Sequence, residues 1–125
     1  MELALQTVIG LGTLMLAGLG LMSMLSPGRM AGIFGVGTTG PVGLSTIRSA
    51  MGGMFLSCAA MLAAGQLTGL TLWFIPVAVT MSAIAAGRLI SMAFDGFDTQ
   101  VVPPLVIELV LAAALTTAHM QGAAA

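Results

Sequence analysis

Charged residues are scarce in this sequence. Its 125 residues include three Lys or Arg and four Asp or Glu, which is 6% of the chain, whereas ordinary soluble domains carry about a quarter charged residues. So few charges cannot cover the surface of a soluble domain, and 58% of the residues are apolar. There is no lysine and the formal net charge is -1, so the basic surface that attracts nucleic acid is missing. Nucleic-acid binding is therefore excluded.

Residues that carry metal, redox or catalytic chemistry are equally few. Cys58 is the only cysteine, which rules out an intrachain disulfide or a CxxC pair, so it is interpreted as a small packing residue. His119 is the only histidine and stands far from the charged residues. The eleven methionines raise the alternative of Cu(I) binding through thioethers, but they are dispersed and favour gap filling. We find no catalytic motif and expect no enzyme activity, cofactor or metal site.

Long uncharged runs indicate membrane-spanning helices. Residues 3–25 contain no charge, and residues 49–87 form a second uncharged run. A helix needs roughly 20 residues to cross the hydrocarbon core, so the second run must hold two helices and a turn. With one further apolar segment after Pro103 and Pro104, the sequence predicts an all-α membrane protein, a bundle of four transmembrane helices.

Turn and capping residues set the expected boundaries. Pro27 suits the first position of a short helix that lies in the membrane interface, and Pro76 suits the first turn of the third span. The glycine-rich stretch 35–43 is read as a loop, with Ser45 as the N-cap of the second span. The expected transmembrane helices are about 3–25, 45–66, 73–94 and 103–120, with the interfacial helix at about 27–34, all in one domain covering residues 1–125.

The arginines predict an orientation. Four crossings place both termini on one side, and the loops near Arg29, Arg48 and Arg88 on the other. Because arginine-bearing loops favour the cytoplasm, the termini are expected on the periplasmic side of a bacterial inner membrane. The early sequence lacks the basic region of a signal peptide, so the first segment is expected to be retained.

Four charged residues are expected to form one polar layer near the loop-side surface. From the helix lengths, Arg88 lies about 9 Å deep, Glu108 roughly 6 to 8 Å and Arg48 roughly 5 Å, while Asp95 lies at the rim on the face of Arg88. An unpaired charge at such depth costs at least about 2.5 to 3.5 kcal/mol. We therefore predict pairing of Arg88 with Glu108, and of Arg48 with Asp95 or Glu108.

The polar layer has two interpretations. It is either a structural clamp that fixes helix order, or a site in which one arginine binds an anionic, lipid or quinone-like ligand. Small residues point to close helix packing, with Gly52, Gly53 and Gly87 as the positions that let neighbours approach.

Several segments together resemble a known family. They are Ser-Pro-Gly-Arg-Met-Ala-Gly-Ile-Phe-Gly-Val from Ser26, Ile-Arg-Ser-Ala-Met-Gly-Gly-Met-Phe from Ile47, Gly-Arg-Leu from Gly87, Asp95-Gly96 and Glu108-Leu109. Their order and spacing, from about Leu14 to Ala118, resemble a family of small bacterial four-helix membrane proteins described as a domain of unknown function. The resemblance implies a single four-helix domain and no particular activity. It places Arg48, Gly52, Gly53, Arg88, Asp95 and Glu108 at characteristic positions of the family.

Two hypotheses for function follow. The first is a non-enzymatic accessory or assembly subunit of a larger inner-membrane complex, of the respiratory or photosynthetic type for example, whose partners are the lipid bilayer and other membrane subunits. The second is a binder or carrier of a small anionic, lipid or quinone-like ligand through Arg48, Arg88 and Glu108. Mass spectrometry after native purification distinguishes a protein partner from a retained small molecule.

Overall fold

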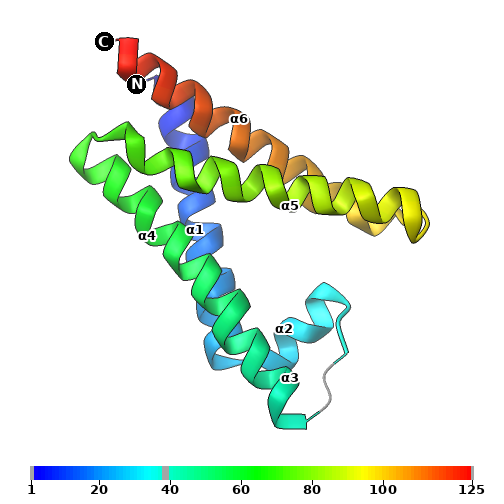
Figure 1. Cartoon of the computed structure of the whole chain (residues 1–125). Coiled ribbons are helices and arrows are strands. Elements are labelled where there is room, and N and C mark those ends of the chain that lie inside the picture. Colours follow the sequence, from blue (N-terminus) through cyan, green and yellow to red (C-terminus); the bar gives the residue numbers. More distant parts are fainter. Residues whose placement is uncertain (1, 38–39, 125) are drawn as a thin grey trace. The chain divides into compact units, whose positions relative to one another are not determined.

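The chain is an all-α, multi-pass membrane protein. The computed structural model describes residues 2–37 and 40–124; it is 91% helical, and the described residues contain no strand (Figure 1). Four helical stretches in this part of the chain are long and apolar enough to cross a membrane: Leu3–Leu25, Gly40–Thr68, Thr71–Phe94 and Thr99–Gly122. The predicted fold class is confirmed.

The first two helices have the predicted bounds. Helix α1 covers Leu3–Leu25 and the short helix α2 covers Pro27–Phe34. Pro27 occupies the start of α2, where its missing N–H costs no hydrogen bond within the helix. Helix α2 ends at Gly35, whose φ of 66° is left-handed, while the N–H of Val36 donates to the carbonyl of Ala31 over 2.8 Å. This arrangement satisfies carbonyls at the end of a helix.

The second span begins earlier than predicted. It consists of α3 (Gly40–Thr46), a π-helical stretch η1 (Ile47–Met51) and α4 (Gly52–Thr68). The predicted loop through Gly43 and the predicted N-cap at Ser45 are therefore wrong, as is the start at residue 45. Gly40 has a φ of 68°, and Pro41 follows it in the first turn, where proline is tolerated. A glycine and a proline that were read as loop signals are in fact the start of the helix.

The other two spans follow short 3-10 helices. Helix η2 covers Thr71–Trp73 and leads into α5 (Phe74–Phe94), with Pro76 in the first turn as predicted. Helix η3 covers Thr99–Val101 and leads into α6 (Val102–Ala124). The predicted bounds were 73–94 and 103–120, so α6 continues for four residues beyond its predicted end. Its last residues include alanine, the best helix former.

The described residues form two compact units. The terminal unit comprises the residues up to Ile9 and those from Ala64 onward, and the central unit comprises Gly10–Ala63. The terminal unit contains α5, α6, the first turns of α1 and the last turn of α4. The central unit contains the rest of α1 and α4 together with α2, α3 and η1. The single domain expected over residues 1–125 stays a prediction.

In the central unit, α1, α2 and α4 share an apolar core. The rings of Phe34 and Phe55 stack with centroids 6.1 Å apart and planes 17° apart, which joins α2 to α4. A Cβ at Gly20 of α1 would lie 2.7 Å from the Leu56 side chain of α4. Helices α1 and α4 therefore touch closely at a position that only glycine allows.

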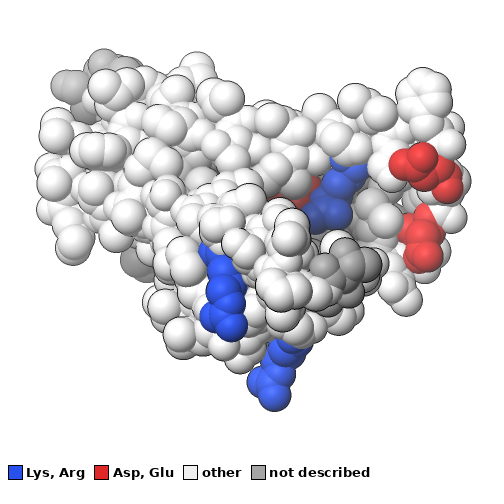
Figure 2. Space-filling model, turned by 60° about the horizontal axis from the view of Figure 1, so that its bottom comes forward, with Lys and Arg blue, Asp and Glu red and all other residues white. Residues whose placement is uncertain are grey.

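Charged side chains occupy little of the molecular surface. Figure 2 shows one face of the molecule as mostly uncharged atoms with a few separate basic and acidic patches. Many large apolar side chains are exposed, including Leu14 at 72%, Leu67 at 87% and Phe94 at 83%. A surface of this composition suits lipid tails rather than water.

Candidate functional site

Helices α5 and α6 lie side by side in the terminal unit and carry the central pair of the candidate site (Figure 1). Their buried residues recur at spacings of three and four, which places them on one face of each helix. Arg88 follows the last of these positions on α5, and Glu108 begins the set on α6. The buried residues are Phe74, Val77, Ala78, Met81 and Ala85 on α5, and Glu108, Leu111, Ala112, Ala114, Leu115 and Ala118 on α6.

Arg88 and Glu108 form an ion pair between the two helices. The Nε–H of Arg88 donates to both carboxylate oxygens of Glu108, over 2.8 Å to Oε1 and 2.9 Å to Oε2. The side chain of Glu108 is 10% exposed and that of Arg88 is 26% exposed. The predicted pairing of these two residues is confirmed.

This geometry leaves part of the guanidinium available. Arginine has five N–H donors, and the hydrogen bonds it makes within the described residues both come from Nε. The two terminal nitrogens make no hydrogen bond within the described residues. A planar guanidinium with free terminal donors suits a phosphate or carboxylate group, which it can bind with two parallel hydrogen bonds.

Asp95 takes part in a turn beside this pair. It is the C-cap residue of α5, and the hydroxyl of Ser91 donates to its Oδ2 over 2.9 Å. Its side chain is exposed, and Gly96 follows with a φ of 95°. The structure thus places Asp95 one helical turn beyond Ser91 and gives it a hydroxyl partner. Its position at the rim of a polar layer stays a prediction.

Arg48 lies in the central unit, within the π-helical stretch η1. It is eight residues from the start of its span rather than in the first turn, because the helix begins at Gly40. Its Nη1 donates to the backbone carbonyl of Met24, in the last turn of α1. The last carbonyls of a helix lack partners within it and carry partial negative charge, so Arg48 caps α1. Pairing of Arg48 with Asp95 or Glu108 stays a prediction.

The three glycines predicted as close-packing positions differ in their surroundings. A Cβ at Gly52 would lie 3.0 Å from Cγ of Met24, so this glycine lets α1 approach α4 in the central unit. At Gly53 and Gly87, a Cβ would meet no described atom within 4 Å. The sequence singled out Gly52 correctly, and it missed Gly20, which faces Leu56 in the same way.

A polar contact at the other end of the terminal unit was not predicted. The hydroxyl of Thr71 lies 3.1 Å from Nδ1 of His119, joining η2 to the last turns of α6. Thr71 and His119 are 48 residues apart, so only the return of α6 to the α4–α5 turn brings them together. The lengths of α5 and α6 place Thr71 and His119 at the same end of the unit, but length alone does not bring the two side chains into contact.

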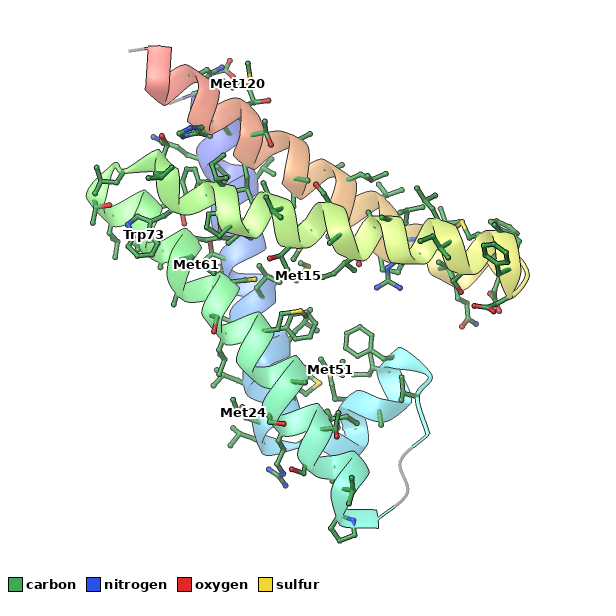
Figure 3. The ribbon with its side chains drawn as sticks, in the orientation of Figure 1. Met15, Met24, Met51, Met61, Trp73 and Met120 are labelled. Atoms are coloured by element: carbon green, nitrogen blue, oxygen red, sulfur yellow. The ribbon has the colours of Figure 1, made fainter. Side chains whose placement is uncertain are left out.

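The methionines behave as packing residues in the part of the chain described. Met30 and Met81 are buried, with 0% and 2% exposure, and Met24 packs against Gly52. Figure 3 shows Met15 and Met24 on α1 and Met51 and Met61 on the second span, at different heights along these helices. Flexible unbranched side chains of this kind fill irregular gaps between helices.

Comparison with known proteins gives a family and no individual relative. A search of the curated proteins and a search of the solved structures each found no match. A family profile matches residues 4–119. This range includes Arg88 and Glu108, which form the ion pair, and also Arg48 and Asp95. The chain therefore belongs to the family described as Domain of unknown function (DUF4345).

Proposed function

We propose that this protein is a non-enzymatic membrane subunit that works by helix contact, as an accessory or assembly component of a larger inner-membrane complex. Complexes of the respiratory or photosynthetic type are candidates. The observation that carries the proposal is the outward face of α5, opposite the face that packs on α6. Four small residues are exposed there, at positions one helical turn apart: Ser82, Ala83, Ala86 and Gly87.

Small residues matter on such a face because lipid gives apolar helices no hydrophobic reason to associate. Close backbone approach then supplies the packing energy, and small residues at a spacing of four permit that approach. Beside the small residues lie Val79 and Ile90, which are 62% and 60% exposed. These larger side chains can fill the grooves of a partner helix.

The proposed location follows from the arginines. We place the protein in a bacterial inner membrane with both termini in the periplasm, because the arginine-bearing loops favour the cytoplasmic side. Because the described residues consist mainly of membrane-spanning helices, the complex that this protein assists would contact it through membrane helices.

Native purification in mild detergent tests the proposal. Mass spectrometry of the wild-type preparation should identify a larger membrane protein in constant ratio to this chain. Gly87→Leu places a bulky side chain on the outward face of α5 and should remove that partner while the protein still accumulates. Ala113→Leu, at an exposed position of α6, is the matched control and should retain it. Equal recovery with all three proteins, or no partner in constant ratio, would contradict the proposal.

A second function is favoured by the free donors of Arg88. The proposal is that an anionic lipid headgroup or a small anionic or quinone-like molecule binds to the terminal guanidinium nitrogens, with Glu108 fixing the guanidinium from the other side. The sequence also assigned Arg48 to this site. Its bond to the Met24 carbonyl supports a capping role instead, so the proposal is restricted to Arg88 and Glu108.

The two roles of Arg88 can be separated. If Arg88→Ala abolishes accumulation of the protein, the ion pair is a structural clamp. If the variant accumulates normally but native mass spectrometry shows loss of a bound anion, the ligand site is favoured. Arg88→Lys refines this result, because it keeps the positive charge but lacks the planar pair of terminal donors.

A further inference from the structure

A pocket lies in the terminal unit at the end where the four spans meet near both termini. It has a volume of about 300 Å³, within the lower range of small-molecule sites. It is bordered by the first turns of α1, the end of α4, the turn before α5 and the last turns of α6. Its lining consists of Gln6, Gly65, Gln66, Gly69, Thr71, Ala118, Gln121 and Gly122.

The lining concentrates uncharged hydrogen-bonding groups in a chain that has few of them. Three of the four glutamines of the sequence line this pocket, the exception being Gln100. Each primary amide carries two N–H donors and a carbonyl acceptor. Thr71 adds a hydroxyl that is already paired with His119. Such a set can both donate to and accept from the oxygens of a ligand.

Close packing holds the walls of the pocket in place. A Cβ at Gly65 would lie 2.4 Å from a ring carbon of Phe74, and a Cβ at Gly122 would lie 2.8 Å from the Thr71 side chain. The ends of α4 and α6 therefore approach the start of the third span as closely as glycine permits. The Thr71–His119 contact links the same two walls. The cavity is thus a built feature of the terminal unit.

The charge around the pocket selects for a neutral ligand. No Asp, Glu, Lys or Arg lines it. Among the described residues, Glu2 is the ionised group nearest in sequence, one helical turn before Gln6, and it disfavours anions. Arg88 is 17 residues along the third span from Thr71, about 25 Å at the helical rise. An anionic headgroup would leave water without a counter-ion, which is costly.

The position of the pocket indicates a membrane lipid as the source. Thr71 belongs to the same short helix as Trp73, which is 43% exposed, and tryptophan prefers the headgroup level of a bilayer. Figure 3 shows Trp73 at the turn between α4 and α5 and Met120 near the end of α6. Residues of this turn and of the end of α6 line the pocket. An apolar tail could then lie along the exposed helices.

We infer that this pocket binds the uncharged, oxygen-bearing headgroup of a membrane lipid, through the amides of Gln6 and Gln121. Two lipids share this chemistry: an isoprenoid quinone, whose ring carbonyls accept hydrogen bonds, and a glycolipid, whose sugar hydroxyls donate and accept them. The site is distinct from the Arg88–Glu108 pair and is independent of the functions proposed above.

Trp73 provides the measurement, because it is the only tryptophan and lies two residues from Thr71. The purified protein is placed in phosphatidylcholine nanodiscs and titrated with a short-chain benzoquinone, which quenches indole fluorescence on close approach. The wild type should show a saturable phase above the linear quenching by dissolved quinone. In a parallel titration, a monoglucosyl diacylglycerol should instead give a saturable shift of the emission if the sugar is the ligand.

Matched variants decide the outcome. Replacing Gln6 and Gln121 by leucine removes two hydrogen-bonding side chains at exposed positions, and should weaken the saturable phase about tenfold or more. Gln121→Glu, which changes the shape little, should weaken it as well. Gln100→Leu, outside the pocket, should leave it unchanged. The inference is overturned if neither lipid gives a saturable response, or if the response is the same in wild type and in the Gln6 and Gln121 variants.

Discussion

At the scale of single residues, the Arg88–Glu108 pair is the feature with the largest expected effect on stability. Glu108 is nearly buried and its carboxylate has the Arg88 guanidinium as its partner. Removing one member of a buried pair leaves the other charge uncompensated. We expect Glu108→Ala to lower the free energy of unfolding by about 3–5 kcal/mol, measured by reversible unfolding in mixed detergent micelles.

Two controls separate charge from shape in this experiment. Glu2→Ala removes an exposed carboxylate and should change the unfolding free energy by less than about 0.5 kcal/mol. Replacing Arg88 and Glu108 together by leucine removes both charges, and should restore stability to the wild-type value or raise it by about 1–4 kcal/mol. A double variant as unstable as Glu108→Ala would show that the pair is not the cause.

Arg48 makes a smaller and separate contribution. Its bond to the carbonyl of Met24 places a cation at the negative end of α1. We expect Arg48→Ala to cost about 0.3–1 kcal/mol, the usual range for an exposed cation at the end of a helix. The same unfolding assay measures it. Arg29 is exposed on α2, and Arg29→Ala should be neutral; equal losses in both variants would contradict the capping role.

The residues of the candidate site differ in how far the sequence could predict them. The pairing of Arg88 with Glu108 follows from helix lengths, because two adjacent antiparallel spans bring equal depths together. The cap made by Arg48 could not be predicted, since the start of its helix was misplaced by five residues. The contact of Thr71 with His119 needs the relative rotation of two helices, which spacing alone does not give.

At the scale of secondary-structure elements, Gly20 sets the distance between α1 and α4. A Cβ there would lie 2.7 Å from Cγ of Leu56 and 3.0 Å from its backbone nitrogen. Backbone cannot yield as a flexible side chain does, so Gly20→Ala should destabilise the protein by about 1–3 kcal/mol. The matched control is Gly18→Ala, where a Cβ meets no described atom within 4 Å.

The control should move stability in the opposite direction. Alanine restricts the unfolded chain more than glycine and favours a helix, so Gly18→Ala should stabilise by about 0.4–1 kcal/mol. Opposite signs in thermal or detergent unfolding would establish that Gly20 is required by packing. If Gly20→Ala also stabilises the protein, the close approach of α1 and α4 has no energetic importance.

Element boundaries were predicted well where one signal was unambiguous. Pro27 begins α2 and Pro76 lies in the first turn of α5, both as expected. The prediction was wrong at Gly40 and Pro41, which were expected in a loop and instead begin α3. A glycine–proline pair is typical both of a loop and of the first turn of a helix. The choice depends on whether the next residues continue the helix. Here they do, with Leu44 half-buried and Ile47 buried.

At the scale of the whole molecule, composition was sufficient to predict four crossings and insufficient to predict what they contact. Length and hydropathy fix the number of spans, because each must cover the hydrocarbon core. An apolar helix face, however, has similar residues whether it meets lipid or another helix. The sequence did not predict the pocket, because its glutamines come from three spans that are far apart in the sequence.

The last prediction concerns the side on which the termini lie. Four crossings require Glu2 and Gln121 to face the same compartment and Thr99 to face the opposite one. In a Cys58→Ala background, single cysteines at these three positions should react with a membrane-impermeant maleimide in two groups. Intact cells should label the Glu2 and Gln121 positions if the termini are periplasmic, and only permeabilised cells should label the Thr99 position. Labelling of the first two positions from opposite sides would require an odd number of crossings, and the pocket could not then gather the ends of all four spans.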